Sequence, residues 1–230
     1  MEIESLHSWE VTPREAMGIQ AGLAAKVSRE PPRGFAPSLV AAADISCNRF
    51  SNTLFAAVVV VTLQELDVVE TRTCRVRAGF PYVPGLLSFR EIPALVAAFR
   101  SLEHEPDAIL MDGQGMAHPR RCGLACHAGL MLGKPTVGVA KSVLVGDFEP
   151  PPPDRGEFSP LVHGEETVGR ALRTRAGVKP VFVSVGHMTD LDAACELVLR
   201  CAPKYRIPEP LREAHNAANA ARREYYAARD

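Results

Sequence analysis

The sequence contains no long apolar run. None of its stretches reaches the roughly 18 uninterrupted apolar residues that a membrane span requires. The longest candidate, residues 54–63, has the length of a strand and includes Thr62. The first five residues carry neither the basic nor the apolar region of a secretory signal. We therefore expect no membrane segment and a cytoplasmic protein.

The sequence also lacks an excess of positive or negative charge, and it lacks closely spaced cysteine pairs. The formal net charge is −1, so no global field attracts nucleic acid, and any such contact depends on a local patch. The six cysteines form no C-x-x-C pair. Cys122, Cys126 and His127 could form half of a metal site, but no second half with zinc-like spacing follows. Free, buried thiols are the favoured interpretation.

The chain has 230 residues, 47% of them hydrophobic, which suits one domain over residues 1–230 with a sizeable core. Hydrophobic spacing and turn residues predict three strands in an antiparallel meander, followed by strands that alternate with helices. Residues 146–160 are proline-rich and polar, which predicts a surface loop. The expected fold class is α/β, with a mixed sheet flanked by helices. The expected strands are 39–46, 54–63, 66–76, 108–111, 136–140, 167–174 and 181–185, and the expected helices are 12–28, 89–102, 119–132, 190–201 and 208–228.

Two aspartates follow buried strands. Asp44 comes near the end of the first expected strand and Asp112 directly after the fourth. If these strands are parallel neighbours, both carboxylates lie at the same edge of the sheet, where functional groups gather. Carboxylates that close repel unless a cation lies between them, and Mg²⁺ or Mn²⁺ suits oxygen ligands. The alternative is that both residues only form turns at strand ends.

Other polar residues cluster near these strand ends. Glu91 closes the pattern S-x-x-E from Ser88, so it either caps a helix or faces a metal. His118 could bind a phosphate oxygen, shuttle a proton or simply bond the backbone. Arg120 and Arg121, next to an expected helix start, favour anion binding. Lys141 follows another strand and could reach a phosphate or remain solvated.

The segment Pro81-Tyr82-Val83-Pro84-Gly85 places an aromatic residue between two prolines. Because proline fixes φ, the tyrosine ring is expected on a stiff loop. Such a ring suits a wedge that enters a base stack next to a site that cuts phosphodiesters. The simpler alternative is a proline-rich turn whose tyrosine packs on its neighbours.

Taken together, these segments closely resemble the endonuclease V family of deoxyinosine-directed repair nucleases. The resemblance runs in order from about residue 10 to 220, and its second and third motifs are long and specific. The matching stretches are ADIS (43–46), PYVPGLLSFRE (81–91), MDGQGMAHPRR (111–121), GVAKS (138–142) and PEPLREAH (208–215). Family members often carry His or Asn in place of Gln114, which leaves fine positioning at that residue in question.

The resemblance implies an RNase H-like fold and a Mg²⁺-dependent cut, with Mn²⁺ as a substitute. It implies DNA containing deoxyinosine as substrate, cut at the second phosphodiester bond 3′ to the lesion to leave 3′-hydroxyl and 5′-phosphate ends. Asp44 and Asp112 would ligate the metal. The implied catalytic set is Asp44, Glu91, Asp112, His118, Lys141 and His215. The implied substrate-binding set is Tyr82 as wedge with Pro81, Val83, Pro84, Gly85, Leu87, Gly113 and Leu124 around the base.

Three functional hypotheses remain. The first is the inosine-directed endonuclease, acting on DNA and also considered for inosine-containing RNA. The second is another RNase H-like, structure-specific nuclease, which needs the acids but no pocket around residues 81–87. The third is a catalytically silent nucleic-acid-binding protein, against which the intact acids argue. A monomer is the simplest expectation.

Overall fold

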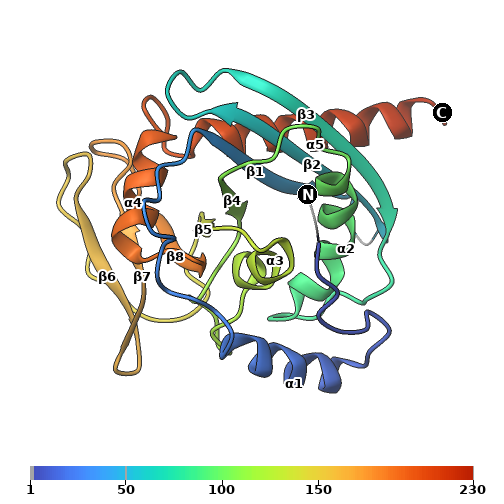
Figure 1. The fold of residues 1–230 in the computed structure, drawn as a ribbon, viewed down its shortest axis with the longest axis horizontal. Coiled ribbons are helices and arrows are strands. Elements are labelled where there is room, and N and C mark those ends of the chain that lie inside the picture. The colour runs from blue at the N-terminus through green and yellow to red at the C-terminus, as the bar shows by residue number, and fades with distance from the viewer. Residues whose placement is uncertain (1–2, 50, 230) are drawn as a thin grey trace.

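A single eight-stranded sheet takes its strands from most of the chain in the computed structural model, which describes residues 3–49 and 51–229 (Figure 1). The strand order is β3-β2-β1-β4-β5-β8-β7-β6. Strands β1, β4 and β5 are parallel, and every other neighbouring pair is antiparallel. The strands are β1 (Leu39–Ser46), β2 (Thr53–Thr62), β3 (Val68–Arg77), β4 (Ala108–Asp112), β5 (Thr136–Ala140), β6 (Phe158–His163), β7 (Glu166–Leu172) and β8 (Val181–His187).

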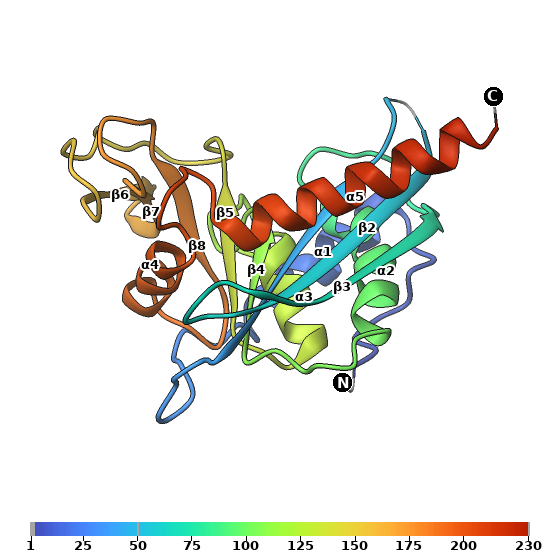
Figure 2. The same cartoon turned by 90° about the horizontal axis from the view of Figure 1, so that it is seen from above.

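Helices cover both faces of this sheet. On one face α2 and α3 pack against alternate residues of β1, β2 and β4, and α1 lies outside α3. On the other face α4 and α5 pack on the remaining alternate residues, and α5 crosses β1, β2 and β3 (Figure 2). The helices are α1 (Pro13–Ala24), α2 (Leu87–Arg100), α3 (Leu124–Leu132), α4 (Leu191–Arg200) and α5 (Glu209–Ala227).

Burial on both faces explains the composition of the central strands. Strand β1 reads Leu-Val-Ala-Ala-Ala before Asp44, with Ala42 facing α5 and Ala43 facing α2. A strand between two helical layers has no solvated face, so it carries an apolar run instead of an alternating pattern. The predicted meander, mixed sheet and flanking helices are confirmed.

Several predicted boundaries are wrong. The first helix, expected to run to residue 28, ends at Ala24. Residues 158–160 belong to β6 and not to the expected loop, because β6 is an edge strand in which Pro160 needs no ladder partner for its missing N–H. Residues 119–123 form a turn, and α3 begins only at Leu124. Arg121 has φ of 54°, a left-handed conformation that no helix can include.

The half-site formed by Cys122, Cys126 and His127 is structural in the described chain. Both thiols are buried and free. The ring of His127 is fully buried, bonds Ser88 and His7, and stacks on Trp9. These contacts tie the N-terminal segment to α3. Among the described residues, no helix is long and apolar enough to cross a membrane.

Candidate active site

Asp44 and Asp112 lie side by side at the carboxyl ends of two neighbouring central strands. Strands β1 and β4 are parallel neighbours, and Ala43 is in register with Met111. The next residue in each strand is therefore an aspartate. Their side chains are 11% and 17% exposed, so water screens their charges only weakly. The predicted convergence of the two acids is confirmed by this register.

Glu91 completes a cluster of three acids. Burial, followed by the negative charges of Asp44 and Asp112, raises the pKa of Glu91 to about 8. Burial and then Asp112 raise the pKa of Asp44 as well, despite hydrogen bonds from His215 and the Ile45 amide. Burial is the larger cause of both shifts, and the mutual repulsion of the acids adds to it.

The capping alternative for Glu91 is wrong. Helix α2 begins at Leu87, and its N-cap, Leu86, makes no side-chain capping bond. Ser88 lies inside the first turn, where its hydroxyl bonds Nδ1 of His127 at 3.1 Å. Glu91 therefore faces the two aspartates instead of closing a capping box.

Each aspartate is held by a basic side chain. Lys141, directly after β5, forms an ion pair with Oδ2 of Asp112. His215 on α5 donates from Nδ1 to Oδ2 of Asp44 at 2.7 Å. The tautomer follows from the amide of Asn219, which donates to His215 Nε2 at 2.9 Å. The sequence analysis missed Asn219, which also accepts a hydrogen bond from the hydroxyl of Ser46.

The donor chemistry of the cluster fits a hard divalent cation. Within residues 3–49 and 51–229, no group of three or more His, Cys, Asp or Glu side chains is arranged to hold a metal. The adjacent carboxylates of Asp44 and Asp112 nevertheless supply the oxygen ligands that Mg²⁺ and Mn²⁺ prefer. The mutual repulsion of the acids, which adds to burial in raising the pKa of Glu91, is the electrostatic condition that such a cation relieves.

The loop at residues 81–85 is stiff and presents Tyr82 to solvent. The Tyr82 residue is 72% exposed, so the tyrosine does not pack on its neighbours as the simpler alternative required. The amide of Leu86 donates to the carbonyl of Val83 at 2.9 Å, which closes the turn. Gly85 adopts φ of 77°, which favours glycine, and a Cβ there would lie 2.9 Å from the guanidinium of Arg120.

The side chain of His118 holds this loop through a hydrogen bond to its backbone. Its Nε2 donates to the carbonyl of Gly85 at 3.0 Å, and its Nδ1 accepts from the amide of Arg120 at 3.2 Å. Burial and the nearby charge of Arg120 lower the pKa of His118 to about 4. In this structure His118 is neutral, and both of its ring nitrogens form hydrogen bonds with the backbone. This is the backbone-bonded alternative of the sequence analysis.

Arg120 and Arg121 both bond groups of the protein itself. Arg120 bonds the carbonyl of Gly85 at 2.7 Å and the side chain of Gln20 at 2.5 Å. Arg121 bonds Glu166 at 2.7 Å and the carbonyl of His118 at 2.9 Å. Their guanidinium groups are committed to protein partners, and α3 begins only at Leu124 after the N-cap Gly123. Both arginines thus have structural roles, and anion binding by them stays a prediction.

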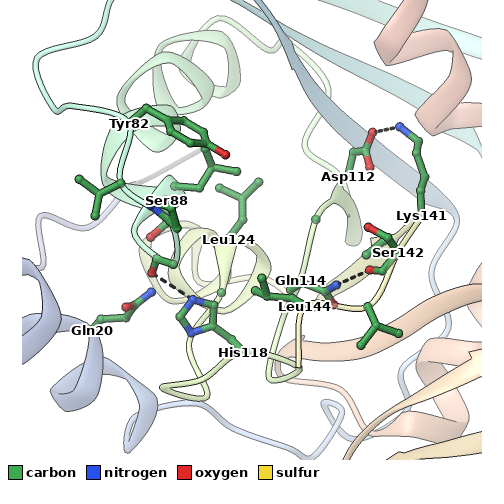
Figure 3. A pocket seen from close by; sticks show the side chains of 18 residues that line it. Gln20, Tyr82, Ser88, Asp112, Gln114, His118, Leu124, Lys141, Ser142 and Leu144 are labelled. Carbon is green, nitrogen blue, oxygen red and sulfur yellow. Dashed lines mark hydrogen bonds and ion pairs between the residues drawn. The ribbon is translucent and has the colours of Figure 1, made fainter. Parts of the chain in front are cut away.

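A cavity of about 390 Å³ joins the loop to the acid cluster. Figure 3 shows Tyr82 on one side of it and Asp112 with Lys141 on the other. Of the predicted site residues, Tyr82, Val83, Pro84, Gly85, Leu87, Asp112, Gly113, His118, Leu124 and Lys141 line it. Pro81, Asp44, Glu91 and His215 are not among its lining residues, and the last three gather at the acid cluster.

Several lining residues were not predicted. Gln20 reaches the cavity from α1, and Ser142, Val143 and Leu144 reach it from the segment after β5. Leu144 is 48% exposed, which is unusual for a leucine beside a polar site. Its place three residues after Lys141 was the signal available in the sequence. Gln20 gave no local signal, because its amide is positioned by contacts with Arg120 and the carbonyl of Cys122.

Gln114 holds the segment after β5 in place. Its Nε2 donates to the carbonyl of Ser142 at 2.9 Å, while its buried Oε1 has no hydrogen-bond partner in the described chain. The side chain therefore couples the turn after Asp112 to the residue after Lys141.

The mixed α/β fold and the cluster of acids at this site are typical of a nuclease, and comparison with known proteins supports that class. The family model for Endonuclease V matches residues 21–216. The Endonuclease V of Dehalococcoides mccartyi (strain ATCC BAA-2100) is 50% identical over 218 residues, covering 95% of this chain and 97% of that protein. The chain therefore belongs to the endonuclease V family, and it is an endonuclease.

Solved structures support the same assignment. The crystal structure of Endonuclease V from Streptomyces avermitilis superposes with a TM-score of 0.91 at 44% identity, covering 98% of this chain and all of that one. The Ciona intestinalis Endonuclease V (D234N) superposes with a TM-score of 0.82 at 27% identity, covering 94% of this chain and 100% of that one. That protein was crystallised with a 23mer DNA containing an inosine followed by a ribo-adenosine.

Proposed function

We propose that this protein is a DNA repair endonuclease that recognises deoxyinosine and cuts the second phosphodiester bond on its 3′ side, leaving 3′-hydroxyl and 5′-phosphate ends. The cut depends on Mg²⁺, with Mn²⁺ as a substitute. The observation that carries this proposal is the shared cavity, which has an exposed aromatic loop on one side and Asp112 with Lys141 on the other. Base reading and cutting therefore have separate places. The inosine-containing DNA bound by the Ciona relative supports the substrate.

The loop side of the cavity suits an everted base. Tyr82 fills the gap that the base leaves in the stack, and the prolines hold its ring in place. Gly85, Leu87, Gly113 and Leu124 form the walls, where backbone groups read the edge of hypoxanthine. Eversion costs a few kcal/mol, and less for a mispaired base, so the weak pairing of inosine favours it.

The other side of the cavity suits phosphodiester hydrolysis. Asp44 and Asp112 would hold the divalent cation, with Glu91 completing the acidic set. When bound, such an ion activates water and stabilises charge on the phosphate and the leaving oxygen. Lys141 places a positive charge beside Asp112, near the position of a phosphate. His215 orients Asp44 through its Nδ1 proton and is itself oriented by Asn219.

Inosine-containing RNA is a second candidate substrate. The support is the ribo-adenosine that follows the inosine in the DNA bound by the Ciona relative. A contact to a 2′-hydroxyl would distinguish the two substrates. The expectations of a monomer and of a cytoplasmic location stay predictions.

The test is an incision assay on two duplexes of the same sequence, one with a single deoxyinosine and one without, each with Mg²⁺ or with EDTA. We expect a nick only in the deoxyinosine duplex with Mg²⁺. Equal cutting of both duplexes would favour a structure-specific nuclease. Binding without any nick would favour a silent binding protein.

A further inference from the structure

A second exposed tyrosine lies outside the cavity that Tyr82 lines. Tyr205, in the segment between α4 and α5, is 43% exposed. The guanidinium carbon of Arg212, on the first turns of α5, lies 3.5 Å from the centre of its ring. A guanidinium stacked on an aromatic ring loses little further freedom when its edge N–H groups bind an anion.

The guanidinium donors of Arg212 are not used by the protein. Among residues 3–49 and 51–229, the guanidinium contacts the ring of Tyr205, and no acceptor takes a hydrogen bond from it. Arg206, six residues earlier, differs because it donates to the carbonyls of Lys141 and Pro180 at 2.9 and 2.8 Å. Arg206 is thus a structural residue, whereas Arg212 is oriented but unpaired.

The Arg206 bond places this surface next to the acid cluster. It joins the segment that carries Tyr205 to Lys141, whose amine pairs with Asp112. His215, which bonds Asp44, follows Arg212 by three residues and so lies on the same face of α5. In Figure 3, Lys141 and Asp112 lie across the cavity from Tyr82. The surface therefore lies on the Lys141 side of the cavity.

We propose that Tyr205 and Arg212 form a docking surface for the phosphate backbone of the substrate strand on the 3′ side of the cut. This inference rests on the proposed function, in which the cut lies 3′ to the lesion. A strand whose lesion base enters beside Tyr82 runs in the 3′ direction to the acids and then onto Arg212. The guanidinium binds one phosphate through its edge donors, and the exposed Lys204, which precedes Tyr205 in the chain, adds positive charge to this segment. The carboxylates of Glu209 and Glu213 nearby limit any general positive field, so the contact depends on Arg212 itself.

The experiment measures equilibrium binding, without divalent cation, to two deoxyinosine duplexes over a range of salt. One duplex extends well beyond the cut on the 3′ side, and the other ends just past it. We expect R212A to weaken binding to the long duplex and to lower its salt slope by about one. We also expect R212A to bind the long duplex no more tightly than the short one. Y205A, which leaves α5 unchanged and frees the arginine, is expected to show a smaller loss of the same kind.

R75A is the matched control. The guanidinium carbon of Arg75 lies 4.4 Å from the ring centre of Tyr225, near the far end of α5. This pair is the same kind of arginine–tyrosine stack as Arg212 on Tyr205, but it lies away from the acid cluster. We expect R75A to retain the wild-type slope and the long-duplex advantage. An unchanged slope in R212A, an equal loss with both duplexes, or an equal effect in R75A would overturn the docking surface. Failure of the proposed function is separate, since the wild-type protein itself would then not prefer or cut deoxyinosine duplexes.

Discussion

His118 donates a hydrogen bond of 3.0 Å from Nε2 to the carbonyl oxygen of Gly85. This bond joins the turn after β4 to the loop that carries Tyr82. Because the other ring nitrogen accepts from the Arg120 amide, the ring is held in one neutral tautomer. The buried histidine thus ties the aromatic loop to the turn that follows Asp112.

The first prediction concerns His118 and acid. Burial lowers its pKa to about 4 in the folded protein, below the value of about 6.5 expected in the unfolded chain. Its contribution to stability is therefore complete above pH 6.5 and declines as the pH falls toward 4. Between pH 7 and pH 5 the wild-type protein should lose about 2 kcal/mol more stability than H118Q, which keeps a donor but does not titrate. Urea unfolding at both pH values measures this difference. Equal losses in the two proteins would show that His118 is not held neutral.

Removal of the Tyr82 ring should reduce selectivity without affecting stability. The side chain is exposed, so Y82A should unfold at the same urea concentration as the wild-type protein. A stacked base contributes roughly 1–3 kcal/mol, so discrimination between deoxyinosine and normal duplexes should fall at least about fivefold. Y82F should retain it. F158A, which removes another exposed aromatic residue on β6, serves as the control. Unchanged discrimination in Y82A would exclude the wedge.

Gly113 should limit the size of the base pocket. A Cβ at this position would lie 3.3 Å from Cδ2 of Leu124, which lines the same cavity. We expect G113A to cut deoxyinosine duplexes several-fold more slowly and L124A to restore part of the rate in the double variant, as a double-mutant cycle detects. G22A is the control, because a Cβ there meets no atom within 4 Å. Additive effects of G113A and L124A would contradict the steric coupling.

Loss of either aspartate proposed to bind the metal should abolish cutting while lesion binding persists. D44N and D112N keep the side-chain shape and remove one charge each. The expected loss is several kcal/mol of transition-state stabilisation, at least about a hundredfold in rate. D192N, which alters an exposed carboxylate paired with Arg170, is the control. A near-normal rate in D44N or D112N would remove the metal assignment.

Local sequence patterns predicted the parts of the fold that depend on continuous burial. The apolar runs before Asp44 and Asp112 gave both strands, and their parallel pairing brought the two acids together. The patterns failed at β6, where Pro160 and neighbouring polar residues resemble a loop but lie on a sheet edge. They also failed at residues 119–123, where the left-handed Arg121 delays the start of α3.

The parts of the site that depend on distant contacts were not predictable. The role of Ser88 depends on His127, and that of Asn219 depends on His215 and Ser46. The commitment of Arg120 to Gln20 and Gly85 is likewise fixed only by tertiary packing. The residues near the strand ends do gather at one place in the fold, but their partners decide which of them face the cavity and which support it.

The most direct test of the account is to map the ends of the product from a duplex with one deoxyinosine at a known position. The proposed function predicts a single nick at the second phosphodiester bond 3′ to the lesion, with a 3′-hydroxyl and a 5′-phosphate. The nick should appear with Mg²⁺ or Mn²⁺ and disappear with EDTA. A nick at the lesion itself, scattered cuts, or the same nick in EDTA would contradict the account.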